Sequence, residues 1–202
     1  MPRRRKFEGV DFAESDVELL TFDLDIPGTG FRCSRREFVT YWKQGRVKRE
    51  CDSSVCHCWL IREESGLAAY ITLLADKLEV DSPLLKSEDI KYRTFPAVKI
   101  GLLAADERAK GAGTRLVEWA LEYIAADLSQ KIGVRFVTVD ALYDPDNGYD
   151  TSGYYRRFGF LLADPHGPVP PPVPYRTMFL DLKPLIDAIH GTNPSPKDDF
   201  GT

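Results

Sequence analysis

Apolar positions in the first half of the chain are arranged as strands. Residues 56–61 and 67–74 are two apolar runs separated by a short charged turn, which predicts a β-hairpin. The run 95–104 is apolar on both faces, as in a central strand that is covered from both sides. Residues 76–93 are charged and contain a proline, so we expect a loop there.

Two other segments have apolar residues at helical spacing. The longer one, 114–130, predicts an amphipathic helix laid on a sheet. Its apolar side consists of Leu116, Val117, Ala120, Leu121, Ile124 and Leu128. A shorter helix is expected from 35 to the mid-forties, because Ser34 and Glu37 have the spacing of a capping box and an aromatic face follows them.

The second half of the chain predicts further strands and short helices. The expected strands are 134–139, 160–162 and 176–182, and the expected helices are 151–158 and 183–190. Residues 144–148 have the composition of a turn, and the proline-rich stretch 165–174 is expected to be extended. This order of elements predicts an α+β fold around one mixed sheet.

Length and composition fit a single domain. The chain has 202 residues, 43% of them hydrophobic, which is enough for a core. We expect a flexible basic arm over 1–15, a folded domain over 16–190 and a disordered tail over 191–202. No apolar run approaches the roughly 20 residues that span a bilayer, and no apolar segment follows the basic N-terminus as in a secretory signal. We therefore expect a cytoplasmic protein with no membrane partner.

Positive charge is concentrated locally, although the formal net charge is −4. The overall charge argues against a general polyanion binder. One basic cluster comprises Arg32, Arg35, Arg36, Lys43, Arg46, Lys48 and Arg49. Two interpretations stay open, a solvated helix face and a docking face for nucleic acid or another anionic partner.

The four cysteines do not have the paired short spacings of common zinc sites. They are Cys33, Cys51, Cys56 and Cys58. We expect reduced, partly buried thiols and no metal site.

A glycine-rich stretch, Arg108-Ala109-Lys110-Gly111-Ala112-Gly113, joins the predicted central strand to the long helix. Glycines let backbone amides approach a ligand closely, and a helix N-terminus carries partial positive charge. The stretch therefore predicts a phosphate site. A second motif, Tyr154-Tyr155-Arg156-Arg157-Phe158-Gly159-Phe160, lies downstream.

Together the two motifs resemble those of the GNAT acetyltransferases. The family has Arg or Gln, two residues, Gly, one residue, and Gly or Ala between strand four and helix three, and here Arg108, Gly111 and Gly113 stand at those positions. Its later Tyr-x-x-x-Gly-Phe motif is matched by Tyr155, Gly159 and Phe160. The resemblance covers most of the folded chain. It implies one domain with a mostly antiparallel central sheet flanked by helices, and an N-acetyltransferase that uses acetyl-CoA as cosubstrate without a metal.

Within the family, the chain is most similar to the toxin-type branch. The similarity is carried by residues 95–101, by Val139-Asp140-Ala141 and by the tyrosine motif. This branch acetylates aminoacyl-tRNA, is paired with ribbon-helix-helix antitoxins, and belongs to a family whose members often dimerise. The resemblance therefore implies charged tRNA, an antitoxin and a second copy as partners. Relative to the branch, this chain has extra residues between Asp140 and Tyr155.

The resemblance also implies roles for individual residues. The cofactor-binding set is Leu102, Leu103, Ala104, Ala105, Arg108, Ala109, Lys110, Gly111, Ala112, Gly113 and Thr114. Loop amides would hold the pyrophosphate, the pantetheine arm would pair with 102–105, and the amide of Leu103 or Ala105 would polarise the thioester carbonyl. The Arg108 side chain would stabilise the loop or reach a phosphate. Tyr155 would be the general acid.

Several alternatives stay open from the residues alone. A purely structural role for Tyr155, as a packing aromatic, stays open, and packing is the role that we expect for Tyr154. The general base is not identified, since Asp106, Glu107, Asp140 and water are all candidates. The acceptor is a small amine, a peptide amine or charged tRNA, the last bound through the basic cluster. A catalytically silent CoA-binding module is the alternative from another class.

Overall fold

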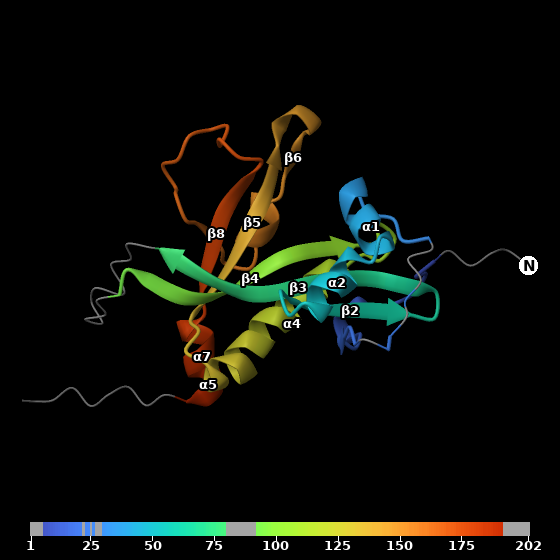
Figure 1. Ribbon diagram of the computed structural model, residues 1–202, viewed down its shortest axis with the longest axis horizontal. Coiled ribbons are helices and arrows are strands. Elements are labelled where there is room, and N and C mark those ends of the chain that lie inside the picture. Colours follow the sequence, from blue (N-terminus) through green and yellow to red (C-terminus); the bar gives the residue numbers. More distant parts are fainter. Residues whose placement is uncertain (1–5, 22, 25, 27–29, 80–91, 192–202) are drawn as a thin grey trace, which may run out of the picture.

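The fold is built on one mixed sheet. The computed structural model describes residues 6–21, 23–24, 26, 30–79 and 92–191. Its strands are β1 (Glu18–Leu19), β2 (His57–Glu63), β3 (Gly66–Glu79), β4 (Thr94–Ala105), β5 (Phe136–Asp144), β6 (Tyr149–Asp150), β7 (Leu161–Leu162) and β8 (Tyr175–Asp181). The strand order is β1-β2-β3-β4-β5-β8-β7, and β6 pairs with β5 (Figure 1). Among these described strands only β4 and β5 run parallel, so the predicted mixed, mostly antiparallel sheet is confirmed.

Helices cover the sheet from both sides. They are η1 (Phe12–Glu14), α1 (Arg36–Lys43), α2 (Arg46–Asp52), α4 (Ala112–Tyr123), η2 (Ile124–Leu128), α5 (Ser129–Lys131), η3 (Pro145–Asn147), α6 (Ser152–Arg156) and α7 (Lys183–His190). The predicted helix 114–130 corresponds to α4, a π-helical turn η2 and α5. The helix 183–190 is found with the expected bounds.

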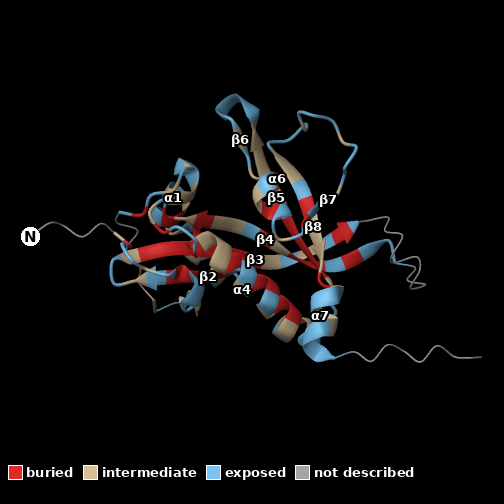
Figure 2. Ribbon diagram, turned by 180° about the vertical axis from the view of Figure 1, so that it is seen from behind, coloured by how far each residue is buried: buried red, intermediate tan, exposed pale blue. Residues whose placement is uncertain are grey.

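Strand alternation divides the core into two layers. Ile61 and Ile71 belong to the cluster under α4, whereas their neighbours Leu60 and Tyr70 belong to the cluster under α1 and α2. All four are fully buried, and Figure 2 shows buried residues along the middle of β2, β3 and β4. Each fully buried aliphatic side chain contributes about 1.5–3 kcal/mol to folding. These layers hold β4, the strand that carries the site, from both faces.

The structure corrects the prediction for the first helix. Arg35 stands at the N-cap without a side-chain capping bond, so the predicted capping box of Ser34 and Glu37 is wrong. The Glu37 carboxylate instead accepts the Arg35 guanidinium at 2.6 Å. A charge-assisted bond is stronger than a neutral bond to a backbone amide, which explains the exchange of partners. The helix α2 was not predicted, and it begins after Gly45, whose φ of +64° turns the chain.

The predicted boundaries also shift at two other places. Phe7 and Phe12 are buried in the core, so residues 6–15 belong to the folded domain, where the sequence indicated a flexible arm. β3 continues to Glu79, although a loop was expected from 76, because Leu78 packs in a small cluster with Phe95 and Phe136. Residues 1–5, 80–91 and 192–202 of the predicted arm, loop and tail lie outside the described residues.

Candidate active site

The site begins at a fork between β4 and β5. The two strands pair from Ala97↔Phe136 to Ile100↔Val139. Beyond this point β4 continues beside β3, whereas β5 turns away beside β8 (Figure 1). One edge of 101–105 is thereby left without a ladder partner, and its backbone groups are available to an extended ligand.

A β-bulge in β4 stands at the base of the fork. The register of β3 against β4 shifts between Ile71 and Leu73, so β4 accommodates an extra residue opposite Thr72. The Thr72 hydroxyl accepts the amide of Leu102 at 2.8 Å. A Cβ atom on Gly101 would lie 2.9 Å from that hydroxyl oxygen, closer than real Cβ contacts. The bulge therefore leaves no room for a side chain at position 101, and glycine fits there.

Alternation along β4 directs two amides into the fork. The amides of Leu102 and Asp106 both point toward β3, where a hydroxyl and a carbonyl accept them. Successive backbone groups point to opposite edges of a strand, so the amides of Leu103 and Ala105 point the other way. These are the two amides named from the sequence as candidates to polarise a carbonyl.

Asp106 ties the glycine-rich loop to the segment before α1. Its side chain is fully buried, and its oxygens accept the amide of Arg32 and both the amide and the guanidinium of Arg108, at 2.7–3.0 Å. Burial alone would raise the pKa of Asp106, but these hydrogen bonds outweigh it and lower the pKa. The Arg108 guanidinium also donates to the Gly30 carbonyl. In this structure the Arg108 side chain therefore stabilises the loop.

The loop presents amides that lack backbone acceptors. Gly111 has a φ of +95° and turns the chain into α4. Among the described residues, the amides of Lys110, Gly111, Gly113 and Thr114 donate to no backbone carbonyl. They lie at the N-terminus of α4, where the helix dipole favours negative charge. Loop and helix together form a cradle suited to a phosphate group.

A cavity of about 470 Å³ brings the predicted residues together. It lies between the loop, β4, the segment leading into α1, and the hairpin formed by β5 and β6. The predicted residues that line it are Leu103, Ala104, Ala105, Ala109, Lys110, Gly111, Gly113, Thr114 and Tyr155. Leu102, Arg108 and Ala112 do not line it, because the Leu102 amide faces β3, the Arg108 side chain is bound to Asp106, and Ala112 is buried in the core.

Tyr155 combines burial with a place in the cavity wall. It is 7% exposed and packs edge-on against Tyr154 and Phe160. Burial raises the pKa of Tyr155 far above its usual value near 10, so its hydroxyl stays protonated at neutral pH. The neighbouring Tyr154 places its hydroxyl beside Gly113, and that oxygen is buried with no hydrogen-bond partner among the described residues. Tyr155 is therefore suited to donate a proton, and Tyr154 lines the same cavity beside the loop.

The cavity separates the candidate carboxylates. Asp106 and Glu107 both line it, but Asp106 has both oxygens occupied, and Asp140 is bonded to Lys99 and Thr177 elsewhere on the sheet. Asp150 also lines the cavity but was not identified from the sequence. Burial would raise the pKa of Asp150, and the Ser152 side chain and amide reverse this effect, so the carboxylate stays charged. Other lining residues that were missed are Cys33, Ser34, Phe38, Tyr149 and Thr151.

Comparison with known proteins supports the fold. No protein-family model and no curated protein matches the chain. AtaT complexed with acetyl-methionyl-tRNAfMet is similar with a TM-score of 0.69 and 20% identity, over 84% of this chain and 96% of that one. A tyrosine-to-phenylalanine mutant of KacT has a TM-score of 0.69 and 22% identity, over 86% of this chain and 98% of that one. AtaTR bound with acetyl-CoA has a TM-score of 0.64 and 21% identity, over 87% of this chain and 97% of that one.

The chain has the GNAT acetyltransferase fold. The fold expected from the two motifs is thus confirmed.

The basic cluster falls into two groups in this GNAT-fold structure. Arg32, Arg36, Lys43, Arg46 and Arg49 are exposed, whereas Arg35 and Lys48 are half-buried. The Arg35 guanidinium is already engaged and less available to an anion, since it is bonded to Glu37 and Asp144 and stacks over the Tyr149 ring at 5.1 Å. Exposed cations next to the segment that lines the cavity are compatible with a docking face for an anion.

Cys33, Cys51 and Cys58 belong to the apolar cluster that includes residues of α1 and α2. Cys51 and Cys56 have their sulfur atoms 3.9 Å apart, and all four thiols are free. Burial raises the pKa of Cys56 to about 12, which disfavours the thiolate that a metal or an oxidant would need. Within the described part of the chain, no group of three or more His, Cys, Asp or Glu residues is arranged to hold a metal ion.

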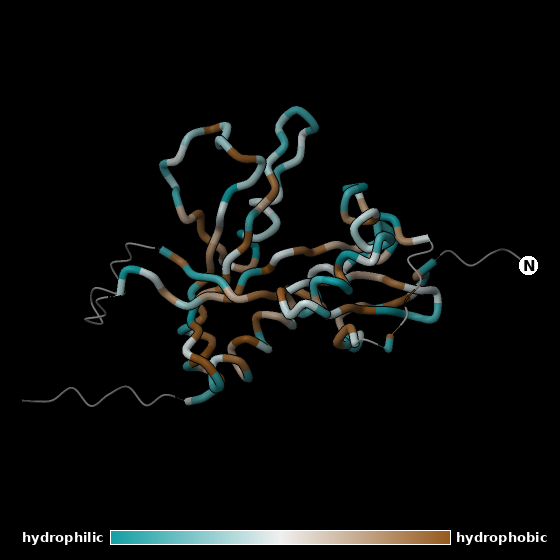
Figure 3. The backbone as a smooth tube through the Cα atoms, viewed as in Figure 1, coloured by the Kyte–Doolittle hydropathy of each residue, from teal (hydrophilic) through white to brown (hydrophobic). Residues whose placement is uncertain are grey.

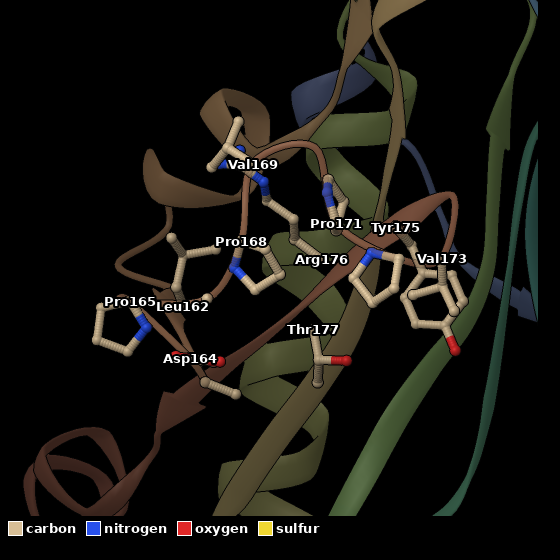
Figure 4. Close-up of a pocket in the computed structure, with 13 residues that line it drawn as sticks. Leu162, Asp164, Pro165, Pro168, Val169, Pro171, Val173, Tyr175, Arg176 and Thr177 are labelled. Carbon is tan, nitrogen blue, oxygen red and sulfur yellow. The ribbon is translucent and has the colours of Figure 1, made fainter.

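A second hollow lies under the proline-rich segment that connects β7 to β8 (Figure 4). Pro165, Pro168, Pro171 and Arg176 are among the residues that line it. None of the predicted site residues lines it, and neither does any residue of the glycine-rich loop. The segment 165–174, expected to be extended, has no helix or strand and consists of a turn at 165–166 and several bends. Across the described residues, no helix has both the length and the apolarity needed to cross a membrane.

Proposed function

We propose that this protein is an acetyl-CoA-dependent N-acetyltransferase that moves an acetyl group to a primary amine. The observation that carries the proposal is the meeting of three elements at one cavity. These are the loop with free amides, the open edge of β4, and the buried hydroxyl-bearing Tyr155. Support also comes from the GNAT fold and from AtaTR, which is bound with acetyl-CoA.

Each element has a distinct part in binding. The amides of Lys110, Gly111, Gly113 and Thr114 hold the pyrophosphate at the start of α4. The open edge of β4 pairs with the amide groups of the pantetheine arm as an added strand would. Asp106 acts through Arg108, because their ion pair fixes the loop before ligand arrives.

The chemistry breaks a thioester bond and forms an amide bond. The amide of Leu103 or Ala105 stabilises the negative charge that develops on the carbonyl oxygen. The acceptor amine attacks in its neutral form, and its second proton leaves to solvent at the open mouth of the cavity. Tyr155 donates a proton to the departing sulfur and recovers one from solvent. No other group is consumed.

Replacing Tyr155 with phenylalanine tests this assignment. Loss of a general acid lowers kcat by about 10²–10⁴-fold, while the Kd for CoA stays within twofold of wild type. Tyr92→Phe is a matched control, because Tyr92 is 79% exposed and does not line the cavity. The measurement is the release of free CoA thiol with an amine acceptor. Full turnover by Tyr155→Phe would overturn the mechanism.

Charged tRNA is the acceptor that we place first among the open alternatives. AtaT is complexed with acetyl-methionyl-tRNAfMet, and the exposed arginines of α1 and α2 here offer a surface for phosphates. AtaT is also bound to the C-terminus of its antitoxin AtaR, so we propose an antitoxin partner for this chain as well. Expression without such a partner would then arrest growth, and Tyr155→Phe would relieve the arrest. A homodimer stays a prediction.

A further inference from the structure

The extra residues between Asp140 and Tyr155 form a hairpin beside the cavity. Tyr143 pairs with Asp150 and Asp144 with Tyr149, and η3 makes the tip. Figure 1 shows this hairpin rising from the sheet toward the start of α1, and Figure 3 shows its tip as hydrophilic. The hairpin therefore places a polar wall on the acceptor side of the proposed active site.

Two walls of the cavity come from distant parts of the chain. One is α1 with the segment leading into it, which contribute Cys33, Ser34 and Phe38, and the other is the hairpin with the residues that follow it. The Arg35 side chain joins them. One guanidinium nitrogen lies 3.0 Å from the Asp144 carboxylate, and the guanidinium stacks over the Tyr149 ring.

The bond between Arg35 and Asp144 is within reach of a ligand. Both side chains are 25% exposed, so the pair lies at the surface rather than in the core. The Asn147 side chain and Arg35 lower the pKa of Asp144, and the bond to Asp144 raises that of Arg35, so both groups are charged at neutral pH. Partly exposed pairs of this kind are weak, and a phosphate that offers two oxygens to one guanidinium is a stronger partner than a single carboxylate oxygen.

We propose that Arg35 is a specificity-determining residue that exchanges Asp144 for a phosphate group of the acceptor, releasing the hairpin as the acceptor enters. The acceptor class is then an amine carried on a phosphate-bearing molecule such as charged RNA. The exposed Arg32 and Arg36 on either side attract such a molecule to this wall. This inference rests on the proposed acetyltransferase function, since the amine must reach Tyr155 between the two walls.

The test compares the tRNA affinity of two variants, one for each partner of the pair. If the pair only stabilised the fold, both variants would change that affinity in the same direction. Asp144→Asn leaves Arg35 paired with Glu37 alone and is expected to tighten the binding of uncharged tRNA about fivefold, whereas Arg35→Gln is expected to weaken it about tenfold. Asp146→Asn is the matched control, because it removes the same charge from the exposed tip of the same hairpin. Binding is measured by fluorescence anisotropy, and KM and kcat are measured with charged tRNA and with an aminoacyl amide that lacks phosphate.

The outcomes separate the inference from the proposed function. The exchange of Asp144 for phosphate at Arg35 is supported when Asp144→Asn and Arg35→Gln shift the KM for charged tRNA in opposite directions, with Asp146→Asn within twofold of wild type. It is overturned when both variants weaken binding, when Asp146→Asn matches Asp144→Asn, or when the wild type binds no tRNA while acetylating the phosphate-free amide. Failure to bind CoA or to acetylate either acceptor would instead refute the proposed acetyltransferase function.

Discussion

Replacing Asp106 with asparagine measures how much the buried ion pair contributes to the fold and to the loop. The variant keeps the shape of the side chain, removes its charge, and places an NH₂ group where an oxygen accepts N–H bonds. Breaking a buried pair by changing one partner costs about 3–5 kcal/mol. Because Arg108 is 30% exposed, solvent compensates in part, and we expect a loss of about 2–3 kcal/mol in the free energy of unfolding.

Urea denaturation and thermal unfolding give the magnitude directly. For a domain of this size the loss corresponds to a melting temperature lower by about 4–12 °C. Since the pair also orients the loop, the Kd for CoA should rise by about tenfold or more in calorimetric titrations. Asp181→Asn is a control, because it breaks a bond to Arg135 that lies on the sheet rather than in the site. It should leave the CoA affinity unchanged.

The pH dependence of the free energy of unfolding independently tests whether the charged form of Asp106 stabilises the fold. The pKa of Asp106 is lower in the folded protein than in the unfolded chain, so its contribution is fully present above the ordinary value of about 3.9. That contribution is lost as the pH falls through the lowered folded value. The stability difference between wild type and Asp106→Asn should therefore shrink below about pH 4. Equal stability of the two proteins at pH 7, with equal CoA affinity, would refute the reasoning.

Two glycine substitutions extend these tests. Gly101→Ala places a methyl group 2.9 Å from the Thr72 hydroxyl oxygen and 2.7 Å from a Leu74 methyl carbon, so we expect about 1–3 kcal/mol of destabilisation in urea unfolding and weaker CoA binding. Unchanged CoA affinity in a folded Gly101→Ala protein would show that the bulge does not shape the site. Gly111→Ala forces alanine to a φ of +95° at a cost of about 1–3 kcal/mol and should weaken CoA binding by calorimetry. Gly133→Ala is its control, because a Cβ there meets nothing within 4 Å, and an equal loss in both variants would contradict the role of the loop.

Local chemistry made the loop predictable, whereas the role of the tyrosine motif came from the family resemblance. A glycine with positive φ before an amphipathic helix has a direct sequence signature, and Gly111 stands where it was expected. The bulge at Gly101 has no such signature, because the steric reason lies in Thr72 and Leu74 on the neighbouring strand. The same holds for the Arg35 side chain, which the sequence placed in a basic cluster at a predicted capped helix, and which binds Asp144 of the hairpin.

The hairpin shows why the acceptor side was less predictable. Its extra length was visible in the sequence, and its turn residues identified a turn. Which wall it would form depends on the separation of β4 and β5, a tertiary feature that no local pattern encodes. Asp150 was missed for this reason, since it becomes a cavity residue only when the hairpin turns back toward α6.

Transfer of label from acetyl-CoA tests the central claim most directly. The purified protein is offered charged tRNA in one reaction and a mixture of small amines and peptides in another, with Tyr155→Phe in parallel. The account predicts stable label on an amine, strongest on charged tRNA, and its loss in the variant. Label on small amines or peptides alone would keep the enzyme class and contradict the tRNA acceptor. Binding of CoA without transfer to any acceptor would contradict the proposed function itself.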